Sequence, residues 1–272
     1  MPELVTRIVV GLIVFGIFLA AIFIGKEPGF LVLGSLGVLL GLHEFYNLVE
    51  MGGFKPQRLT GYLLGLSLFL GNGMVTFYGM SEKYLLFSLL CMFLILPIEL
   101  YRNRPDPFTN IAHGFLGIIY VAVPITLLIN IVHPNDAIGY DPLFFVGWIM
   151  LVLSTDSGAY LAGTAFGKHK LFERISPKKS WEGAAGGLLM SVAFAVGFAQ
   201  FLDFLSVYEW IGLSVVSVVA GIYGDLVESL LKRNVGAKDS GSLLPGHGGI
   251  LDRLDSVGLA TPFAFVYLKL FL

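Results

Sequence analysis

The chain has 272 residues, of which 56% are hydrophobic and only 13% are charged, and its formal net charge is -2. Ordinary soluble domains carry about 25% charged and about 45–50% apolar residues, so the composition excludes a soluble globular fold. The single cysteine, Cys91, excludes an intrachain disulfide.

Apolar runs of near-membrane length recur from one end of the chain to the other. Because a spanning helix needs about 20 mostly apolar residues, these runs predict an all-α polytopic integral membrane protein with nine transmembrane helices. The first run resembles a secretory signal, but we interpret it as a retained helix because further spans follow it. The predicted spans are 5–24, 29–49, 60–80, 83–100, 111–132, 142–165, 182–202, 208–231 and 252–271.

The distribution of basic residues predicts the orientation of these spans. With a cytoplasmic N-terminus, 14 of the 17 Lys and Arg residues fall on the inside and 3 on the outside. This asymmetry satisfies the positive-inside rule and predicts that the C-terminus lies outside. The polar loops 166–181 and 232–251 then share the cytoplasmic side. We therefore divide the chain into 1–141, a scaffold of helices, and 142–272, the part that carries a cytoplasm-facing site.

Carboxylates interrupt the later apolar runs. Asp156 lies within the sixth run, and Asp225 and Glu228 lie in the cytoplasmic half of the eighth. A charge at the centre of a membrane helix costs about 2.5–3.5 kcal/mol, so such groups normally face a cavity, an ion or a partner. For Asp156, a structural contact between helices and a role in a site are about equally supported. Asp225, either Glu228 or Ser229, and Lys232 recur at helical spacing and form a polar stripe.

Asp252 and Asp255 are three residues apart, which places both on one face near the start of the ninth helix. Like charges so close repel unless a cation lies between them. Oxygen donors without cysteine favour a hard divalent ion, and Mg²⁺ typically takes one or two carboxylates. The alternative is that both residues favour the positive end of their helix. Together with Asp225, the metal interpretation is preferred.

Cations bracket these carboxylates, and cations beside a metal imply a polyanionic ligand such as a phosphate chain. His247, between glycines, has three open roles: metal ligand, donor to phosphate or a hydrogen bond within the loop. Four other charged or imidazole groups are expected to make contacts between helices or at helix ends: His43, Glu44, Glu99 and His113. Asp136 and Asp141 fall on the opposite side and are excluded from the site. The bracketing cations are Lys178, Lys179, Lys232, Arg233, Lys238 and Arg253.

The segment SLLKRNVGAKDSGSLLPGHGGILDRLD, Ser229 to Asp255, resembles the signature of the phosphatidate cytidylyltransferases, also called CDP-diglyceride synthases. That signature runs Ser, two residues, Lys-Arg, four residues, Lys-Asp, a Gly/Ser-rich stretch, Pro-x-His-Gly-Gly, two residues and Asp-Arg-x-Asp. The chain follows it without departure. STDSGAYLAG (154–163) and SPKKSWEG (176–183) resemble upstream segments of the same family.

The resemblance implies that CTP and phosphatidic acid react within a membrane to give CDP-diacylglycerol and pyrophosphate. It implies Mg²⁺ as cofactor, with or without a second cation, and Asp225, Asp252 and Asp255 as metal ligands. The family implies a bacterial inner membrane; no nucleic acid partner is expected, and glycine-rich helices are compatible with a homodimer. The implied catalytic residues are Asp225, Asp252, Asp255 and Lys232. The implied substrate contacts are Arg233, Lys238, Asp239, His247, Arg253, Lys178, Lys179 and Ser180.

Two other interpretations compete with this one. A CTP-dependent lipid kinase, or a cytidylyltransferase for another lipid phosphate, would share the acidic and basic clusters but not the whole signature. A transporter of a phosphorylated solute would be a different class. Transporters often carry internal repeats and broken helices near the midplane, whereas no convincing repeat relates the two halves of this chain.

Overall fold

The computed structural model describes residues 2–135, 137–241, 243 and 248–271, which fold almost entirely into helices. Within them, eight helical segments are long and apolar enough to cross a membrane, and the first helix adds a shorter apolar stretch, Val9–Phe23. The predicted polytopic helical fold is therefore confirmed. The helices are α1 (Pro2–Phe23), α2 (Lys26–Met51), α3 (Arg58–Tyr78), α4 (Leu86–Arg102), α5 (Pro107–Gly117), α6 (Val123–Val132), α7 (Pro142–Phe166), α8 (Trp181–Phe198), α9 (Val207–Asn234) and α10 (Leu251–Phe271).

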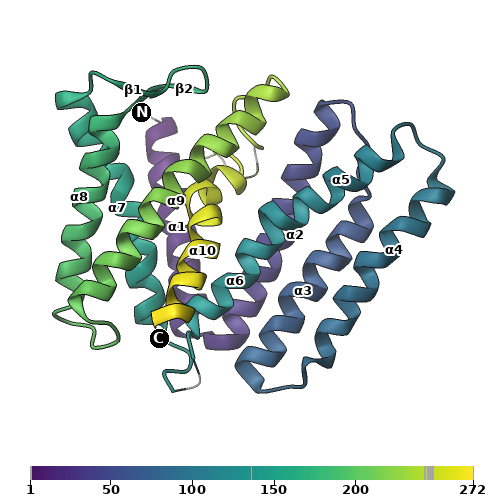
Figure 1. Ribbon diagram of the computed structural model, residues 1–272, viewed down its shortest axis with the longest axis horizontal. Helices are drawn as coiled ribbons and strands as arrows, with labels where there is room; N and C mark the ends of the chain where they lie inside the picture. Colours follow the sequence, from purple (N-terminus) through teal and green to yellow (C-terminus); the bar gives the residue numbers. More distant parts are fainter. Residues whose placement is uncertain (1, 136, 242, 244–247, 272) are drawn as a thin grey trace.

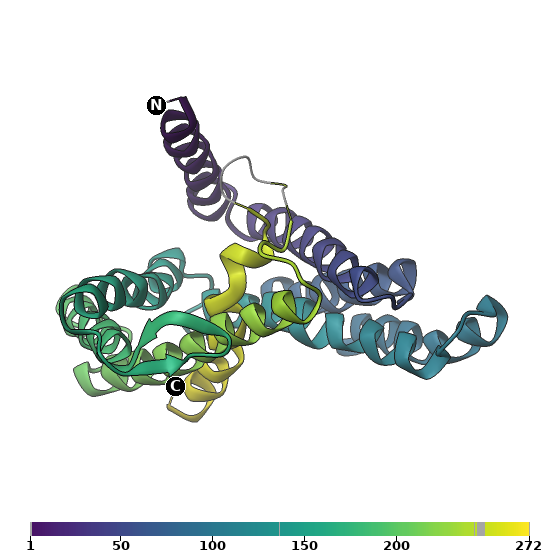
Figure 2. The same ribbon diagram turned by 90° about the horizontal axis from the view of Figure 1, so that it is seen from above.

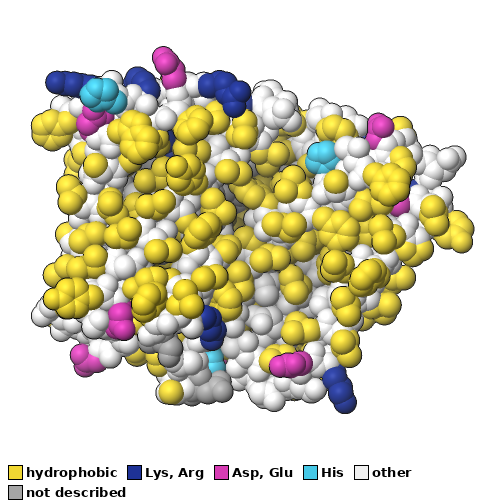
Figure 3. All heavy atoms as spheres, in the orientation of Figure 1, with side chains coloured by type: hydrophobic (Ala, Val, Ile, Leu, Met, Phe, Trp, Pro, Cys, Tyr) yellow, Lys and Arg dark blue, Asp and Glu magenta, His cyan; other side chains and the backbone are white. Residues whose placement is uncertain are grey.

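The helices run between two polar edges of the molecule (Figure 1). On the face shown in Figure 3, hydrophobic side chains cover a broad central band, and most charged side chains lie at its upper and lower borders. This distribution is the one that a lipid bilayer requires of a helical protein, because charged groups are costly in hydrocarbon. The N-terminal and C-terminal ends lie at opposite edges, as an odd number of spans demands (Figure 1).

Short sequence signals set several helix ends. The Asp141 carboxylate caps α7, accepting a hydrogen bond of 2.7 Å from the backbone N–H of Phe144. Ser206 and Glu209 form a reciprocal capping box at the start of α9. Such caps satisfy N–H groups that have no partner within the helix. Asp141 is thus a helix-end group, whereas Asp136 lies outside the described residues.

The fifth predicted span is one helical pass with an irregular turn in its middle. The π-helical segment η2 (Ile118–Ala122) joins α5 to α6. Pro124 is the second residue of α6, and because proline has no N–H it cannot donate to the carbonyl of Tyr120, one turn earlier. Single π-helical turns within α-helices occur frequently at functional sites. The turn carries Tyr120, which lies near the carboxylates of α9 and α10.

Helix α10 lies between two groups of helices (Figure 2). On one side it packs against α9, which contacts α7 and α8, and on the other side against α6 and α2. Helices α7 and α8 approach closely at glycines: a Cβ atom added at Gly158 would lie 2.6 Å from the carbonyl oxygen of Gly186. Small residues permit such close packing where no hydrophobic force drives helices together.

A short antiparallel ribbon connects α7 to α8, and the sequence analysis did not predict it. Strand β1 (Lys170–Phe172) pairs with β2 (Ser176–Ser180), with Lys170 opposite Ser180. The ribbon ends directly at the first residue of α8, where the Ser180 hydroxyl accepts a hydrogen bond of 3.1 Å from the N–H of Gly183. It lies at the same edge of the molecule as the C-terminal end of α9 (Figure 1).

Candidate active site

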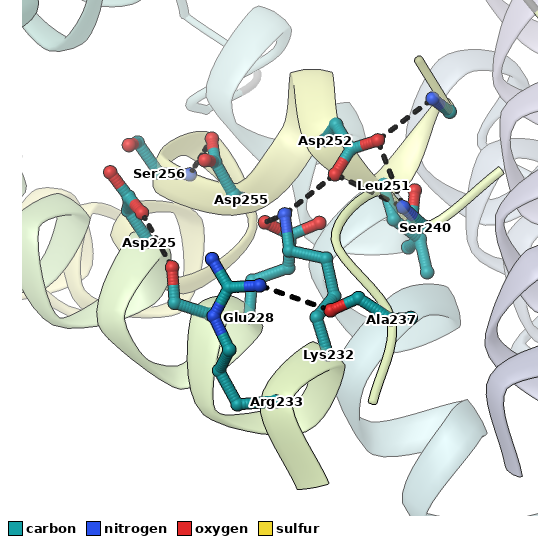
Figure 4. A network of polar contacts seen from close by, with 12 residues as sticks. Asp225, Glu228, Lys232, Arg233, Ala237, Ser240, Leu251, Asp252, Asp255 and Ser256 are labelled. Carbon is teal, nitrogen blue, oxygen red and sulfur yellow. Dashed lines mark hydrogen bonds and ion pairs between the residues drawn. The ribbon is translucent and has the colours of Figure 1, made fainter. Parts of the chain in front are cut away.

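Charged side chains of α7, α9, α10 and β2 form two neighbouring groups. The first, called the Lys232 network, consists of Glu228 and Lys232 on α9 and Asp252 on α10 (Figure 4). The Lys232 ammonium donates to Glu228 Oε2 at 2.7 Å and to Asp252 Oδ1 at 2.6 Å. The three side chains are almost closed to solvent, with exposed fractions of 12%, 1% and 9% in the order Lys232, Glu228, Asp252.

Asp252 also holds the loop that precedes α10. Its carboxylate accepts hydrogen bonds from the backbone N–H of Ser240, at 3.2 and 3.0 Å, and from the N–H of Gly249, at 2.8 Å. Backbone N–H groups at a helix start carry partial positive charge and favour a carboxylate. Both oxygens of Asp252 are therefore engaged by the protein itself, as Figure 4 shows.

Glu44 on α2 holds the same loop from the other side, although it lies far away in the sequence. Its buried carboxylate accepts from the hydroxyl of Ser240 at 3.1 Å and from the N–H groups of Ile250 and Leu251, each at 3.0 Å. This confirms the predicted helix-end contact for Glu44. Its partners could not be predicted, because nothing in an isolated apolar helix shows which loop its carboxylate will meet.

The predicted contacts of the other three groups are also present. His43 contacts the hydroxyl of Tyr62 on α3 at 3.2 Å, and buried Glu99 on α4 accepts from Gln57 at the start of α3. His113 contacts the backbone oxygen of its own helix and stacks on the ring of Phe54. These groups serve the packing of α2 to α5 and lie apart from the Lys232 network.

The second group, called the acidic cluster, consists of Asp156 on α7, Asp225 on α9 and Asp255 on α10. The three carboxylates lie near enough to one another for their negative charges to repel. Asp225 forms an ion pair with Lys179 of β2 and accepts from the hydroxyl of Ser229 at 3.3 Å. Asp255 and Asp225 lie on the same side in Figure 4, away from Asp252.

A cavity of about 220 Å³ borders the acidic cluster. Asp156, Lys178 and Lys179 provide its charged lining, and Ser256, next to Asp255, reaches it from α10. The cavity shares Leu171, Ala184, Val218 and Ile222 with an apolar groove of about 320 Å³ between α8 and α9. The cavity with its charged side chains and the apolar groove therefore lie next to each other. The position of Asp156 on the cavity wall favours a role in the site over a purely structural contact.

The remaining predicted site residues take different positions. The Arg233 guanidinium donates to the carbonyl oxygen of Ala237 at 3.2 Å. Ser180, besides capping α8, lines the cavity. His247 lies outside the described residues. The predicted substrate contacts that are exposed to solvent at this edge are Lys178, Arg233, Lys238, Asp239 and Arg253.

The predicted metal ligands are divided between the two groups. Asp252 belongs to the Lys232 network, whereas Asp225 and Asp255 belong to the acidic cluster. Among the described residues, no three Asp, Glu, His or Cys side chains lie close enough together to hold a metal ion. Two ammonium groups neutralise the carboxylates instead, Lys179 at Asp225 and Lys232 at Asp252. The set of three ligands stays a prediction.

The fold and the site define a class: a polytopic helical membrane protein whose polar site, rich in carboxylates and Lys/Arg, opens at one edge of the bilayer. Comparison with known proteins identifies the family. The family model described as "Cytidylyltransferase family" matches residues 5–271, and the chain belongs to this family.

Curated relatives carry one name, phosphatidate cytidylyltransferase. The protein of Bacillus subtilis is 33% identical over 277 residues, which covers 100% of both chains. That of Haemophilus influenzae is 46% identical over 138 residues, or 48% of each chain. That of Staphylococcus aureus is 36% identical over 183 residues, covering 66% of this chain and 68% of its own.

Proposed function

We propose that this protein transfers the cytidylyl group of CTP to phosphatidic acid, giving CDP-diacylglycerol and pyrophosphate. One observation carries the proposal. Asp156, Lys178 and Lys179 line a cavity that lies next to an apolar groove between α8 and α9 and shares four wall residues with it. A water-soluble nucleotide and a membrane lipid both need access to one place, and this arrangement provides it.

The reaction requires neutralisation of charge more than proton transfer. A phosphate oxygen of phosphatidic acid attacks the α-phosphorus of CTP, a new P–O bond forms, and the bond to the β-phosphate oxygen breaks to release pyrophosphate. Because the attacking phosphate is already ionised, no strong general base is needed. Lys178 and Lys179 on the cavity wall would reduce the repulsion between the two anions and stabilise charge on the transferring group.

The donor chemistry of the acidic cluster fits Mg²⁺. Asp225 and Asp255 offer carboxylate oxygens, and Mg²⁺ is commonly held by one or two carboxylates while substrate phosphates and water complete its shell. These two residues would hold the ion, which when bound supplies positive charge to the phosphates of CTP. Lys179 forms an ion pair with Asp225. Asp252, with both oxygens engaged by Lys232 and backbone N–H groups, would orient the start of α10.

The basic residues support a cytoplasmic site. The spans predicted from the sequence place 14 of the 17 Lys and Arg residues on the same side as the loops 166–181 and 232–251. Under the positive-inside rule this side faces the cytoplasm, where CTP is available. For a bacterial protein the membrane would be the inner membrane, and the apolar groove would admit the acyl chains of the lipid from the bilayer.

The test is conversion of CTP and phosphatidic acid by the purified protein at increasing Mg²⁺ concentrations, with CDP-diacylglycerol and pyrophosphate both measured. We expect both products in equal amounts and a Mg²⁺ requirement that rises strongly in Asp225→Asn and Asp255→Asn. Asp252→Asn should lower the rate without that shift. A lipid kinase would release CDP instead of pyrophosphate, and a transporter would form no product; either result contradicts the proposal.

A further inference from the structure

A second polar cavity, called the basic pocket, lies at the same edge but among the N-terminal helices. It has a volume of about 390 Å³ and lies where the α2–α3 and α4–α5 connections meet. None of its residues belongs to the acidic cluster, the Lys232 network or the sequence signature. The pocket is lined by Glu50, Lys55, Pro56, Arg58, Arg102 and Arg104.

Two of its arginines are held in place by the protein. Arg58 binds both carboxylate oxygens of Glu50, at 2.9 and 2.7 Å, and also donates to Asn47 at 2.7 Å. Arg102 donates to buried Glu99 at 2.7 Å and to the carbonyl oxygens of Lys55 and Pro56 at 2.9 and 3.3 Å. A guanidinium fixed in this way loses little freedom when it binds a phosphate, which is the geometry that arginine recognises well.

The pocket has more positive charge than these partners balance. Glu50 and Glu99 compensate Arg58 and Arg102, whereas Lys55 and Arg104 form no ion pair within the part of the chain that the structure describes. Like charges around one cavity repel one another, so an anion between them would be favourable. The positive-inside rule explains basic residues at this edge, but it does not explain why four of them line one cavity.

The surroundings of the basic pocket are apolar and exposed. Leu59 follows Arg58 and is 71% exposed, while Leu100 and Tyr101 precede Arg102 and are 81% and 89% exposed. Exposed leucines beside a tyrosine are typical of the border between hydrocarbon and headgroups. Basic pockets between membrane helices on the cytoplasmic side are known to bind anionic lipid headgroups. An occupant with both a phosphate and acyl chains therefore fits the site better than a soluble anion.

We propose that the basic pocket binds the phosphate headgroup of an anionic phospholipid. The acyl chains of this lipid lie along the exposed start of α3 and the exposed end of α4. Lys55 and Arg104 provide the charge that is free to pair with the phosphate, and Arg58 and Arg102 provide the fixed donors. This site is separate from the cavity at the acidic cluster, so its occupancy does not depend on the reaction proposed above.

The test measures binding of dioctanoyl phosphatidylglycerol to the protein in a neutral detergent, by calorimetry, for the unaltered chain and for Lys55→Gln/Arg104→Gln. Because neither side chain has an ion-pair partner among the described residues, this variant should keep its thermal stability. Loss of two cations is expected to weaken binding about 30-fold. The matched control is Lys168→Gln/Arg174→Gln, which removes two exposed charges at the same edge, one just before β1 and one between β1 and β2; its affinity should stay within about twofold of the original.

Three further binding measurements distinguish a lipid at the basic pocket from a lipid at the acidic cluster, general attraction to charge and a soluble phosphate ester. Asp225→Asn should retain the affinity, because the lipid is expected at the basic pocket and not at the acidic cluster. Dioctanoyl phosphatidylcholine and glycerol 3-phosphate should both bind much more weakly than the anionic lipid. Equal weakening by both double variants would show only general attraction to charge and would overturn the proposal. Glycerol 3-phosphate binding as tightly as the lipid would assign the pocket to a soluble phosphate ester instead.

Discussion

The Lys232 network and the acidic cluster contain the same chemical groups at the same edge of the molecule, yet they differ in how they are closed. In the network, one ammonium is enclosed by two carboxylates that are 1% and 9% exposed, and backbone N–H groups engage the rest of Asp252. In the cluster, Lys179 and Asp225 are 31% and 25% exposed, and Lys179 and Asp156 line a cavity. The network has no room for a ligand, whereas the cluster has.

The difference separates structural charges from those available for chemistry. The Lys232 network connects α9 to α10 and holds the loop between them. Loss of one of its charged side chains should therefore lower the stability of the fold before it changes the chemistry. The cluster can exchange Lys179 for another cation at little cost, because pairs that are partly exposed contribute only about 0–1 kcal/mol. The signature from Ser229 to Asp255 contains residues of both groups, and only the structure shows to which group each belongs.

The largest expected effect is on the stability of the fold, through the Lys232 network. Lys232→Met leaves Glu228 and Asp252 buried without their cation, and breaking such a pair from one side costs about 3–5 kcal/mol. We expect the variant to unfold at clearly lower temperature or denaturant concentration in detergent. Lys168→Met, an exposed lysine at the same edge, serves as the control and should be neutral. Normal stability with loss of activity alone would mean that Lys232 acts on the substrate and is not structural.

The reverse pattern is expected at the acidic cluster. Asp225→Asn should reduce the rate of CDP-diacylglycerol formation by about 10²–10³-fold, the scale of losing one group that stabilises transition-state charge. Its stability should change by less than about 1 kcal/mol, since the pair with Lys179 is partly exposed. Activity and thermal unfolding are measured on the same preparation. Asp203→Asn, an exposed carboxylate in the α8–α9 connection, is the control, and an equally strong loss there would point to a nonspecific effect.

Hydropathy alone predicted the helical passes, because a bilayer imposes one length and one composition on every span. Helical spacing also predicted the polar stripe of Glu228 and Lys232. The contacts between α9, α10 and β2 were beyond the sequence, since pairing Lys232 with Asp252 or Lys179 with Asp225 depends on how helices pack. The β1–β2 ribbon was missed for a related reason: its strands are three and five residues long and have no hydrophobic alternation to reveal them.

A substitution at Glu44 tests whether the N-terminal helices help to hold the loop that precedes α10. Glu44→Gln removes a charge that accepts from Ser240 and from two N–H groups at the start of α10, and we expect a loss of about 1–3 kcal/mol. Because α10 carries Asp252 and Asp255, kcat should fall while KM for CTP changes little. Glu209→Gln alters a helix cap at the far end of α9 and should leave kcat unchanged. Glu44→Asp, which keeps the charge, should recover part of the rate; no recovery would contradict the role of the carboxylate.

The last comparison is between two glycines of α9. Gly224 packs tightly against α10, whereas Gly221 lies on the cavity wall. A Cβ atom at Gly224 would collide with the carbonyl oxygen of Asp255, whereas one at Gly221 would lie 3.5 Å from Ser256, an ordinary contact on the cavity wall. Gly224→Ala should therefore cost about 1–3 kcal/mol of stability. Gly221→Ala should stay within about 0.5 kcal/mol of the original and raise KM several-fold, because its methyl group occupies space that the substrate needs. The two variants differ by one turn and share every chemical feature of the substitution, so equal stabilities would show that the start of α10 can move to make room for the methyl group at position 224.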